Sequence, residues 1–191
     1  NTNKTQFRLS ETEKYPHVTF FFNAGVEEPF LGESRFMVSS PQVDTYDLMP
    51  EMSAKKVTNK LLDLLRDSSF DFILVNHANP DMVGHTGSLD AAVTACEVVD
   101  DGLGQLYREL ESSGGILILT ADHGNCEQMY DPINCSPHTA HTLNPVPFTI
   151  VGLPGLSEVR CGTLSDIAPT VLDILKIDIP SDMTGRSLLK F

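Results

Sequence analysis

The chain has 191 residues, of which 41% are hydrophobic and 20% charged, so it is long enough to bury a substantial core and is not disordered. Its 13 Lys and Arg residues against 26 Asp and Glu residues give a formal net charge of −13, which argues against nucleic acid or an anionic membrane as the main partner. The four scattered cysteines exclude a disulfide scaffold and are expected to be reduced thiols, and no apolar run is long enough to span a membrane.

The N-terminal segment, residues 1–15, is polar and lacks the hydrophobic stretch of a signal peptide, so we expect a cytoplasmic protein. The chain begins at Asn1 instead of a methionine, which indicates that it is processed or is a piece of a longer protein. No internal repeat or low-complexity tract divides it, and we expect a single domain over residues 1–191.

Apolar runs at four places predict buried β-strands: HVTFFFN at residues 17–23, FDFILVN at 70–76, GILILTA at 115–121 and PFTIVG at 147–152. Amphipathic helices are predicted at residues 53–68, with Ser53 as N-cap, at 89–112 and at 165–176. The alternation predicts an α/β fold, a three-layer sandwich of a mostly parallel sheet with helices on both faces. In the second helix, the residues expected to face the core are Val93, Cys96, Val99, Leu103, Leu106 and Leu110.

Side chains that bind metals follow two of these strands. Ligands of open α/β sheets bind outside the carboxyl ends of the strands, so the loops there are the favoured sites. Mixed aspartate and histidine ligands suit Mn, Zn, Fe or Co better than Ca or Mg. The candidates are Asp81 and His85, four apart and so on one face of a helix, Asp122 and His123 in ADHGN, and His138 and His141 in PHTAHT.

Each pair of candidates also has a purely structural interpretation. Asp81 could cap the helix that follows, Gly124 could supply a left-handed turn residue, and the histidines of PHTAHT could face solvent. Cys126 and Cys135 lie near these loops, but we interpret them as packing residues because no thiolate spacing supports metal binding. Two pairs of an acid and an imidazole and a third pair of histidines, all near predicted strand ends, are hard to explain structurally, which favours a metal site.

Six motifs, in chain order, resemble the C-terminal part of the cofactor-independent (2,3-bisphosphoglycerate-independent) phosphoglycerate mutases, a family of the alkaline phosphatase superfamily. The motifs are ETEKYPHVTFFFN, ANPDMVGHTG, TADHGN, PHTAHTLNPVPF, DIAPTVLDIL and MTGRSLL, and they extend from about Arg8 to Leu189. Phosphopentomutases and sulfatases share the Asp and His ligands, but HVTFFF and PHTAHT are closer to the glycerate mutases. One departure is Ala24, where the family commonly has glycine, which puts the local loop conformation in doubt.

The resemblance implies a role for each candidate residue. Asp81, His85 and His141 would hold one metal ion, usually manganese, while Asp122 and His123 would contribute to a second. Zinc, cobalt or magnesium could replace the manganese. His138 matches a family position to which we assign no role. Lys14 would be a catalytic cation near the transferring phosphoryl group, although its residue type alone indicates an ordinary surface lysine.

The reaction of the family, in glycolysis and gluconeogenesis, interconverts 3-phosphoglycerate and 2-phosphoglycerate through a phosphoserine intermediate. Two metal ions lower the pKa of a serine and offset charge during such in-line transfers. In the family, the serine, further second-site ligands and a basic inserted substrate domain come from earlier segments, and Ser10, Ser39 and Ser40 do not match the nucleophile motif. We therefore interpret the chain as the C-terminal part of the phosphatase-like metal-binding domain and expect it to be inactive alone.

Two other functions stay open. The parent protein could be a phosphatase-like hydrolase or phosphopentomutase of the same superfamily, or the chain could be a non-catalytic metal-binding domain. The expected partner is a small-molecule phosphoglycerate substrate, with no nucleic acid and no membrane, and the whole enzyme is expected to be monomeric. Without N-terminal strands the piece would expose a sheet edge, so we expect it to self-associate or to be marginally stable.

Overall fold

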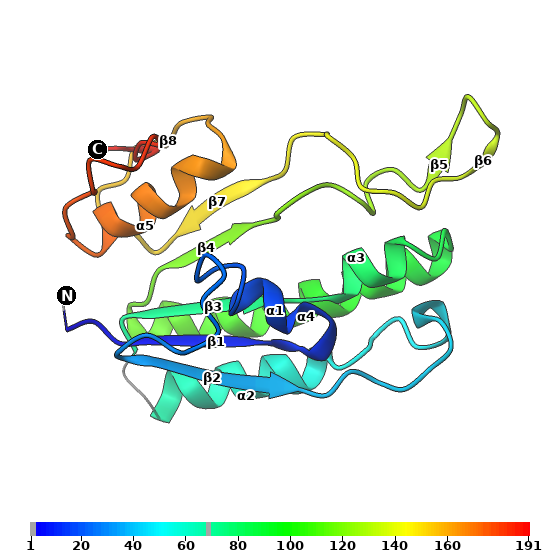
Figure 1. Cartoon of the computed structure of the whole chain (residues 1–191), viewed down its shortest axis with the longest axis horizontal. Coiled ribbons are helices and arrows are strands. Elements are labelled where there is room, and N and C mark those ends of the chain that lie inside the picture. Colours follow the sequence, from blue (N-terminus) through cyan, green and yellow to red (C-terminus); the bar gives the residue numbers. More distant parts are fainter. Residues whose placement is uncertain (1–2, 68–69) are drawn as a thin grey trace.

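The computed structural model describes residues 3–67 and 70–191 (Figure 1). Three parallel strands, β1 (Gln6–Glu11), β2 (Glu33–Val38) and β3 (Phe72–Asn76), form a sheet in the order β2-β1-β3. Ser10 of β1 lies opposite Met37 of β2 and Asn76 of β3. The three strands therefore run in register and end at the same edge of the sheet.

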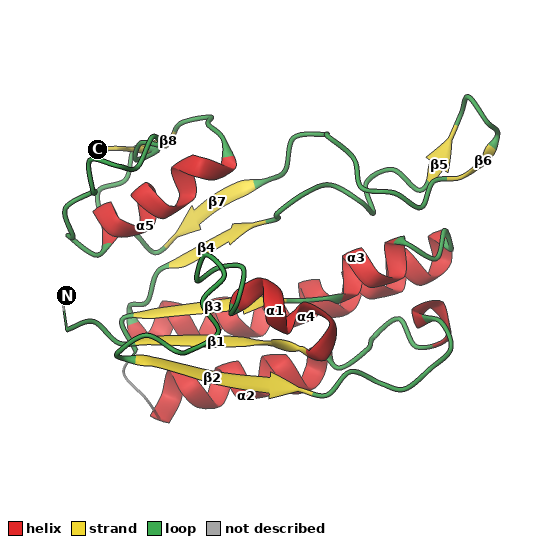
Figure 2. Cartoon of the chain, in the orientation of Figure 1, coloured by secondary structure: helices red, strands yellow, loops and turns green. Residues whose placement is uncertain are grey.

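A second, antiparallel pair consists of β4 (Leu117–Thr120) and β7 (Phe148–Val151). Thr120, the last residue of β4, lies opposite Phe148, the first residue of β7. Because the two strands run in opposite directions, the loop that enters β7 lies at the same edge as the loop that leaves β4. The connection between these strands is mostly loop and carries a short hairpin (Figure 2), in which β5 (Tyr130–Asp131) pairs with β6 (Ser136–Pro137).

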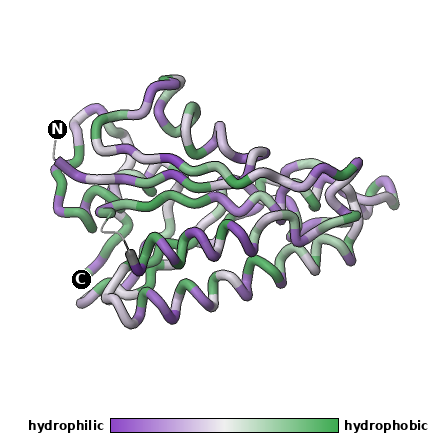
Figure 3. The backbone as a smooth tube through the Cα atoms, turned by 90° about the horizontal axis from the view of Figure 1, so that it is seen from below, coloured by the Kyte–Doolittle hydropathy of each residue, from purple (hydrophilic) through white to green (hydrophobic). Residues whose placement is uncertain are grey.

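Helices lie on both faces of the parallel sheet. The long helices α2 (Ala54–Asp67) and α4 (Leu89–Ser113) form a layer on one face, and the short helix α1 (Tyr15–Val18) lies on the other (Figures 1 and 3). A Cβ atom on Gly102 of α4 would lie 2.6 Å from the Thr58 hydroxyl of α2, so glycine lets the two helices approach closely. The remaining elements are α3 (Asn79–Gly84), α5 (Ile167–Ile174), the paired strands β8 (Glu158–Val159) and β9 (Leu189–Lys190), and the 3-10 helices η1 (Thr12–Lys14), η2 (Tyr46–Leu48) and η3 (Leu164–Asp166).

The main core fills the space between this sheet and its helical layer. Fully burying one such aliphatic or aromatic side chain stabilises the fold by roughly 1.5–3 kcal/mol relative to leaving it exposed. The packing holds β1 in the middle of the sheet, and with it the strand ends that carry the polar loops. The buried residues of this main core are Phe7, Leu9, Val38, Val57, Leu61, Leu62, Leu64 and Leu106.

Most of the predicted elements are confirmed. The strands expected at residues 70–76, 115–121 and 147–152 are β3, β4 and β7, and the three expected helices are α2, α4 and α5. The α/β class, with a parallel sheet and helices, is also confirmed, but β4 and β7 form a separate antiparallel pair. Ser68, the last residue of the first predicted helix, lies outside the described residues. Ser53 directly precedes α2, at the position predicted for its N-cap, and its carbonyl accepts the Val57 N–H at 3.1 Å. Its hydroxyl, however, donates to the Ser39 carbonyl at 2.8 Å.

The strand predicted at residues 17–23 is wrong. Pro16 sits in the first turn of α1, where its fixed φ favours a helix start, and tight turns continue to residue 25. None of residues 17–23 belongs to a strand. The Phe22 ring instead lies 4.2 Å from the guanidinium carbon of Arg8, and Ala24 adopts a left-handed φ of 54°.

Strands β1 and β2 were not predicted, since neither is an apolar run. Three of the six residues of β1 are polar and yet buried: Arg8, Ser10 and Glu11. In α4, Leu106 is buried and Leu103 packs against the core, as predicted, but the buried face differs from the prediction nearer the start of the helix. Val93 and Cys96 are exposed, while small residues that allow close packing are buried in their place, namely Ala91, Ala92, Ala95 and Gly102.

All four cysteines are free thiols, as predicted. Over residues 3–67 and 70–191, no helix is both long enough and apolar enough to cross a membrane.

Candidate metal centre

Polar side chains from four separate segments meet beyond the strand ends. Lys14 belongs to η1, directly after β1, and Asp81 to α3, which follows β3. His123 follows β4, and His141 lies in the loop that enters β7. The parallel register of β1 with β3, and the antiparallel pairing of β4 with β7, bring these four segments to the same side of the molecule.

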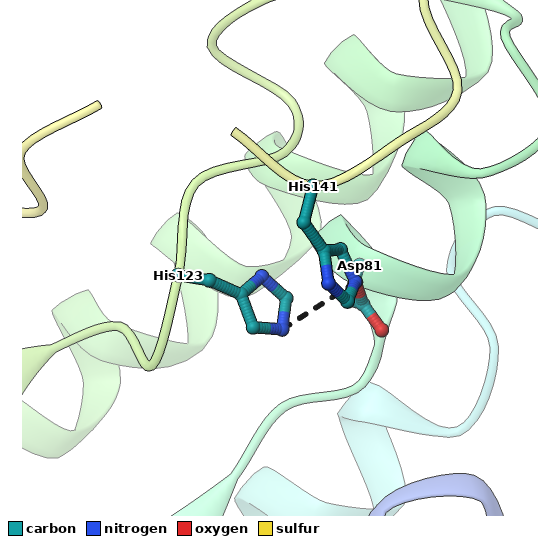
Figure 4. A group of neighbouring side chains, drawn as sticks. All are labelled: Asp81, His123 and His141. Atoms are coloured by element: carbon teal, nitrogen blue, oxygen red, sulfur yellow. Dashed lines mark hydrogen bonds and ion pairs between the residues drawn. The ribbon is translucent and has the colours of Figure 1, made fainter. Parts of the chain in front are cut away.

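The Asp81 carboxylate lies at the centre of this group. Its Oδ1 atom is 2.8 Å from Nε2 of His141, 3.1 Å from Nε2 of His85 and 3.9 Å from Nε2 of His123. Its Oδ2 atom accepts a hydrogen bond from the ammonium group of Lys14. Figure 4 shows the His123 and His141 rings directed at this carboxylate from two different segments.

The histidines present ring nitrogens to one another. Nδ1 of His85 lies 2.7 Å from the Thr139 carbonyl oxygen, which can only accept, so Nδ1 carries the proton and Nε2 offers a lone pair. Nε2 of His85 is 3.0 Å from Nε2 of His141, and the rings of His141 and His123 stack with centroids 3.6 Å apart. So many ring nitrogens around one carboxylate favour a shared cation.

The charge state of Asp81 suits a ligand. Burial by itself would raise the pKa of Asp81, because a carboxylate is poorly solvated there. Hydrogen bonds from Lys14 and Asn125, and the positive charge of Lys14, outweigh burial and hold this pKa well below its usual range. Asp81 is therefore ionised at neutral pH, as a metal ligand must be.

The residue types and positions fit a divalent metal ion. Asp81, His123 and His141 each offer one ligand atom, and these atoms lie within 4.8 Å of one another. His85 adds a fourth donor at the distances given above. A carboxylate with two or three imidazoles is a ligand set typical of Zn, Mn, Fe or Co.

The structure places the other predicted residues differently. Asp122 is exposed, and its Oδ1 lies 3.6 Å from Nε2 of His123, outside the group of three ligand atoms. His138 does not join that group either; its backbone N–H donates to the Met129 carbonyl at 3.0 Å. Lys14 is buried and ion-paired, so interpreting it as an ordinary surface lysine is wrong. Cys126 packs against a core cluster, as expected, and its thiol donates to the Pro80 carbonyl.

Two residues around the site were missed by the sequence reasoning. Asn125 donates from Nδ2 to the Asp81 carboxylate at 3.0 Å, and Glu127 accepts hydrogen bonds from both loops that carry His123 and His141. Asn125 is the last residue of the motif ADHGN, so its position directly after Asp122, His123 and Gly124 could have identified it. Glu127 carries no comparable signal, because an exposed glutamate in a loop is common.

The comparisons with known proteins agree with this geometry. The chain is 57% identical over 185 residues to the 2,3-bisphosphoglycerate-independent phosphoglycerate mutase of Agrobacterium fabrum and 58% identical over 184 residues to that of Paracoccus denitrificans. These matches cover 97% and 96% of this chain and 36% of each relative. The chain thus spans little more than a third of the length of these curated relatives.

A solved structure shares the fold. It is a crystal structure of Leishmania mexicana phosphoglycerate mutase at low cobalt concentration, with a TM-score of 0.91 and 32% sequence identity. The likeness covers 99% of this chain and 38% of that protein. The profile of the metalloenzyme superfamily matches residues 1–179. With nearly its whole length matched and a carboxylate and imidazole cluster at the strand ends, the chain belongs to the metalloenzyme superfamily.

Proposed function

We propose that the chain is the metal-binding part of a phosphoglycerate mutase, which interconverts 3-phosphoglycerate and 2-phosphoglycerate through a phosphoserine. The observation that carries the proposal is the convergence of His85, His123 and His141 on the partly buried Asp81 carboxylate. The phosphoglycerate mutases that match nearly the whole chain support the choice of reaction. The proposal implies a phosphoglycerate substrate, a cytoplasmic setting and a place in glycolysis and gluconeogenesis.

Asp81, His85 and His141 hold one ion in this proposal, because His85 and His141 lie nearest to the Asp81 carboxylate. Asp122 and His123 contribute to a second ion, whose remaining ligands come from residues outside this chain. When bound, divalent ions supply positive charge to the phosphoryl oxygens and lower the pKa of an attacking hydroxyl. Manganese is the ion that we propose, and zinc, cobalt and magnesium are its alternatives. The carboxylate and imidazole donors support a transition metal over magnesium.

Lys14 supplies a second kind of positive charge. It is buried beside the cluster, and its ammonium group contacts the Asp81 carboxylate. A fixed cation in a site of low solvent access stabilises negative charge that develops on a transferring group more strongly than it would in water. We assign Lys14 this electrostatic role. The serine nucleophile and the basic groups that grip the substrate lie outside these residues, so the chain alone is inactive.

A chimera tests the proposal directly. The matching segment of the Paracoccus denitrificans relative, 58% identical to this chain, is replaced by these residues, and the purified chimera is assayed with 3-phosphoglycerate and Mn²⁺. We expect 2-phosphoglycerate to form, and we expect the Asp81→Asn chimera to lose this activity. The isolated chain should show no turnover.

The chimera also separates the alternatives. Release of inorganic phosphate without isomerisation would favour a phosphatase-like hydrolase. A folded, metal-loaded chimera that does neither, beside an active parental relative, would favour a non-catalytic metal-binding domain.

A further inference from the structure

Asn125 links the loop after β4 to the Asp81 carboxylate. Its side chain is buried, and Nδ2 donates to Oδ1 of Asp81 at 3.0 Å and to the Asp81 carbonyl at 3.2 Å. The Oδ1 atom is the same oxygen that faces the ring nitrogens of His85 and His141. Asn125 therefore fixes the rotation of the carboxylate that lies at the centre of the cluster.

Glu127 links Asn125 to the loop that carries His141. Its Oε2 atom accepts the backbone N–H of Asn125 at 2.6 Å. Its Oε1 atom accepts the Thr142 hydroxyl and, at 3.0 Å, the side-chain amide of Asn144. Thr142 directly follows His141, so one carboxylate joins the two loops that carry His123 and His141.

The backbone at this junction is closely packed. The Thr142 N–H donates to the Gly124 carbonyl at 2.9 Å, in an isolated antiparallel bridge. A Cβ atom on Gly124 would overlap both the Thr142 hydroxyl and the Glu127 carboxylate. A Cβ atom on Gly84 of α3 would overlap the Asn125 side chain. The two glycines thus leave room for Asn125 and Glu127 to reach their partners.

Donor and acceptor counting explains why residue 127 is a carboxylate. The Asn125 backbone N–H and the Asn144 amide nitrogen can only donate, and they approach different oxygens of Glu127. Burial alone would raise the pKa of Glu127, but the hydrogen bonds from Thr142, Asn144 and the backbone lower it below its usual range. A glutamine has one acceptor oxygen and one donor group, so it can satisfy only one of the two sides.

From these contacts we infer that Asn125 and Glu127 are positioning residues, which hold the three ligand-bearing segments in place for a divalent metal ion. Asn125 acts on Asp81, and Glu127 joins Asn125 to the segment of His141. The inference rests on the proposed metal site. Outer partners that orient metal ligands change metal affinity by roughly 10–100-fold when they are removed.

Glu127→Gln tests the inference, because it keeps the size of the side chain and removes one acceptor. Glu97→Gln is the matched control, since Glu97 is exposed on α4 and its side chain makes no hydrogen bond to another described residue. The affinity of the 191-residue chain for Mn²⁺ is measured by calorimetry, and thermal unfolding is followed in the presence of a chelator. We expect Glu127→Gln to bind Mn²⁺ at least about 10-fold more weakly. Its metal-free melting temperature should match that of Glu97→Gln.

A double variant adds a test of the link itself. If Asn125 and Glu127 act through one another, Asn125→Ala with Glu127→Gln should weaken binding little more than the larger single effect, because residues of one network are not additive. Full additivity would overturn the link between them. Mn²⁺ affinity of Glu127→Gln equal to that of Glu97→Gln would overturn the inference. Absence of Mn²⁺ binding by the wild-type chain would instead count against the metal site itself.

Discussion

Lys14 and Asp81 form a buried ion pair at the base of the site: only 6% of the Lys14 side chain and 14% of the Asp81 side chain are exposed. The two residues are 67 positions apart and follow different strands of the parallel sheet. Taking Lys14 away removes the ammonium charge that faces the poorly solvated Asp81 carboxylate, and losing one partner of such a pair costs more stability than the pair itself contributes.

Lys14→Met should therefore destabilise the metal-free chain by about 3 kcal/mol. Added Mn²⁺ should reduce the difference from wild type, because a bound cation takes over the neutralisation of Asp81. Urea unfolding with and without Mn²⁺ measures both effects. Lys176→Met is the control, since its ion pair with Asp173 is exposed. A Lys14→Met chain as stable as this control would contradict the account of the pair.

Because we assign His85 to the more tightly bound ion and Asp122 to the second ion, substitutions of these two residues should change the affinity for the first ion unequally. Removing a residue that only orients a metal ligand weakens metal binding by roughly 10–100-fold. His85→Ala should weaken Mn²⁺ binding by at least about 10-fold, because Nε2 of His85 lies 3.1 Å from the Asp81 carboxylate and is proposed to bind the ion directly. Asp122→Asn should change this affinity much less, because Asp122 is exposed and lies outside the group. Calorimetric titration of the two variants compares them. A larger loss in Asp122→Asn would reverse the assignment of the two sites.

Glu11 predicts a specific pH dependence of stability. Its carboxylate is buried at the end of β1, where it accepts the Ser53 N–H and the Ser40 hydroxyl, each at 3.0 Å. Burial raises the pKa of Glu11 above the ordinary 4.5, and the hydrogen bonds from Ser40 and Ser53 offset only part of this. The folded state thus holds the proton more tightly than the unfolded state does.

The sign follows from linkage: this contribution to stability is fully present below the ordinary pKa of 4.5 and is lost as pH rises through the raised value. Glu11→Gln stays neutral and can still accept the Ser53 N–H. We expect the variant to gain stability relative to wild type between about pH 4.5 and neutrality. Urea unfolding at both ends of this range checks the gain. A difference that does not change with pH would show that Glu11 is not the titrating group.

Ala24 adopts φ of 54°, a left-handed conformation that disfavours any residue with a Cβ atom. Ala24→Gly should raise stability by about 1 kcal/mol. Ala95→Gly, within the regular helix α4, should instead lower stability by about 1 kcal/mol. Thermal unfolding of both variants distinguishes the two positions. A lower melting temperature for Ala24→Gly would mean that its backbone is not strained.

Hydrophobic pattern predicted the elements that bury apolar side chains. The apolar runs became β3, β4 and β7, because their residues have no stable alternative to the interior. It failed for β1, in which Arg8, Ser10 and Glu11 are polar and yet buried, and in which the Glu11 carboxylate accepts hydrogen bonds from Ser40 and Ser53, far along the chain. It also failed at residues 17–23, where aromatic residues suggested a strand but Pro16 and successive turns formed α1 and a loop.

In the site, too, some features follow from the sequence and others only from the fold. Residue type and position after strands identified Asp81, His85, His123 and His141, all of which converge in the structure. Pairings between segments could not be predicted, because they depend on β1 lying beside β3 and on β4 and β7 being antiparallel. For this reason the burial of Lys14 against Asp81, and the part of Glu127 in joining two loops, follow only from the fold.

We propose that this chain binds a divalent metal ion through Asp81 and the histidines around it. The most direct test is a calorimetric titration of the 191-residue chain with Mn²⁺, beside His141→Ala. We expect one ion to bind more tightly than any second, with affinity reduced at least about 10-fold in the variant. Mn²⁺ affinity that is the same in wild type and His141→Ala would contradict it.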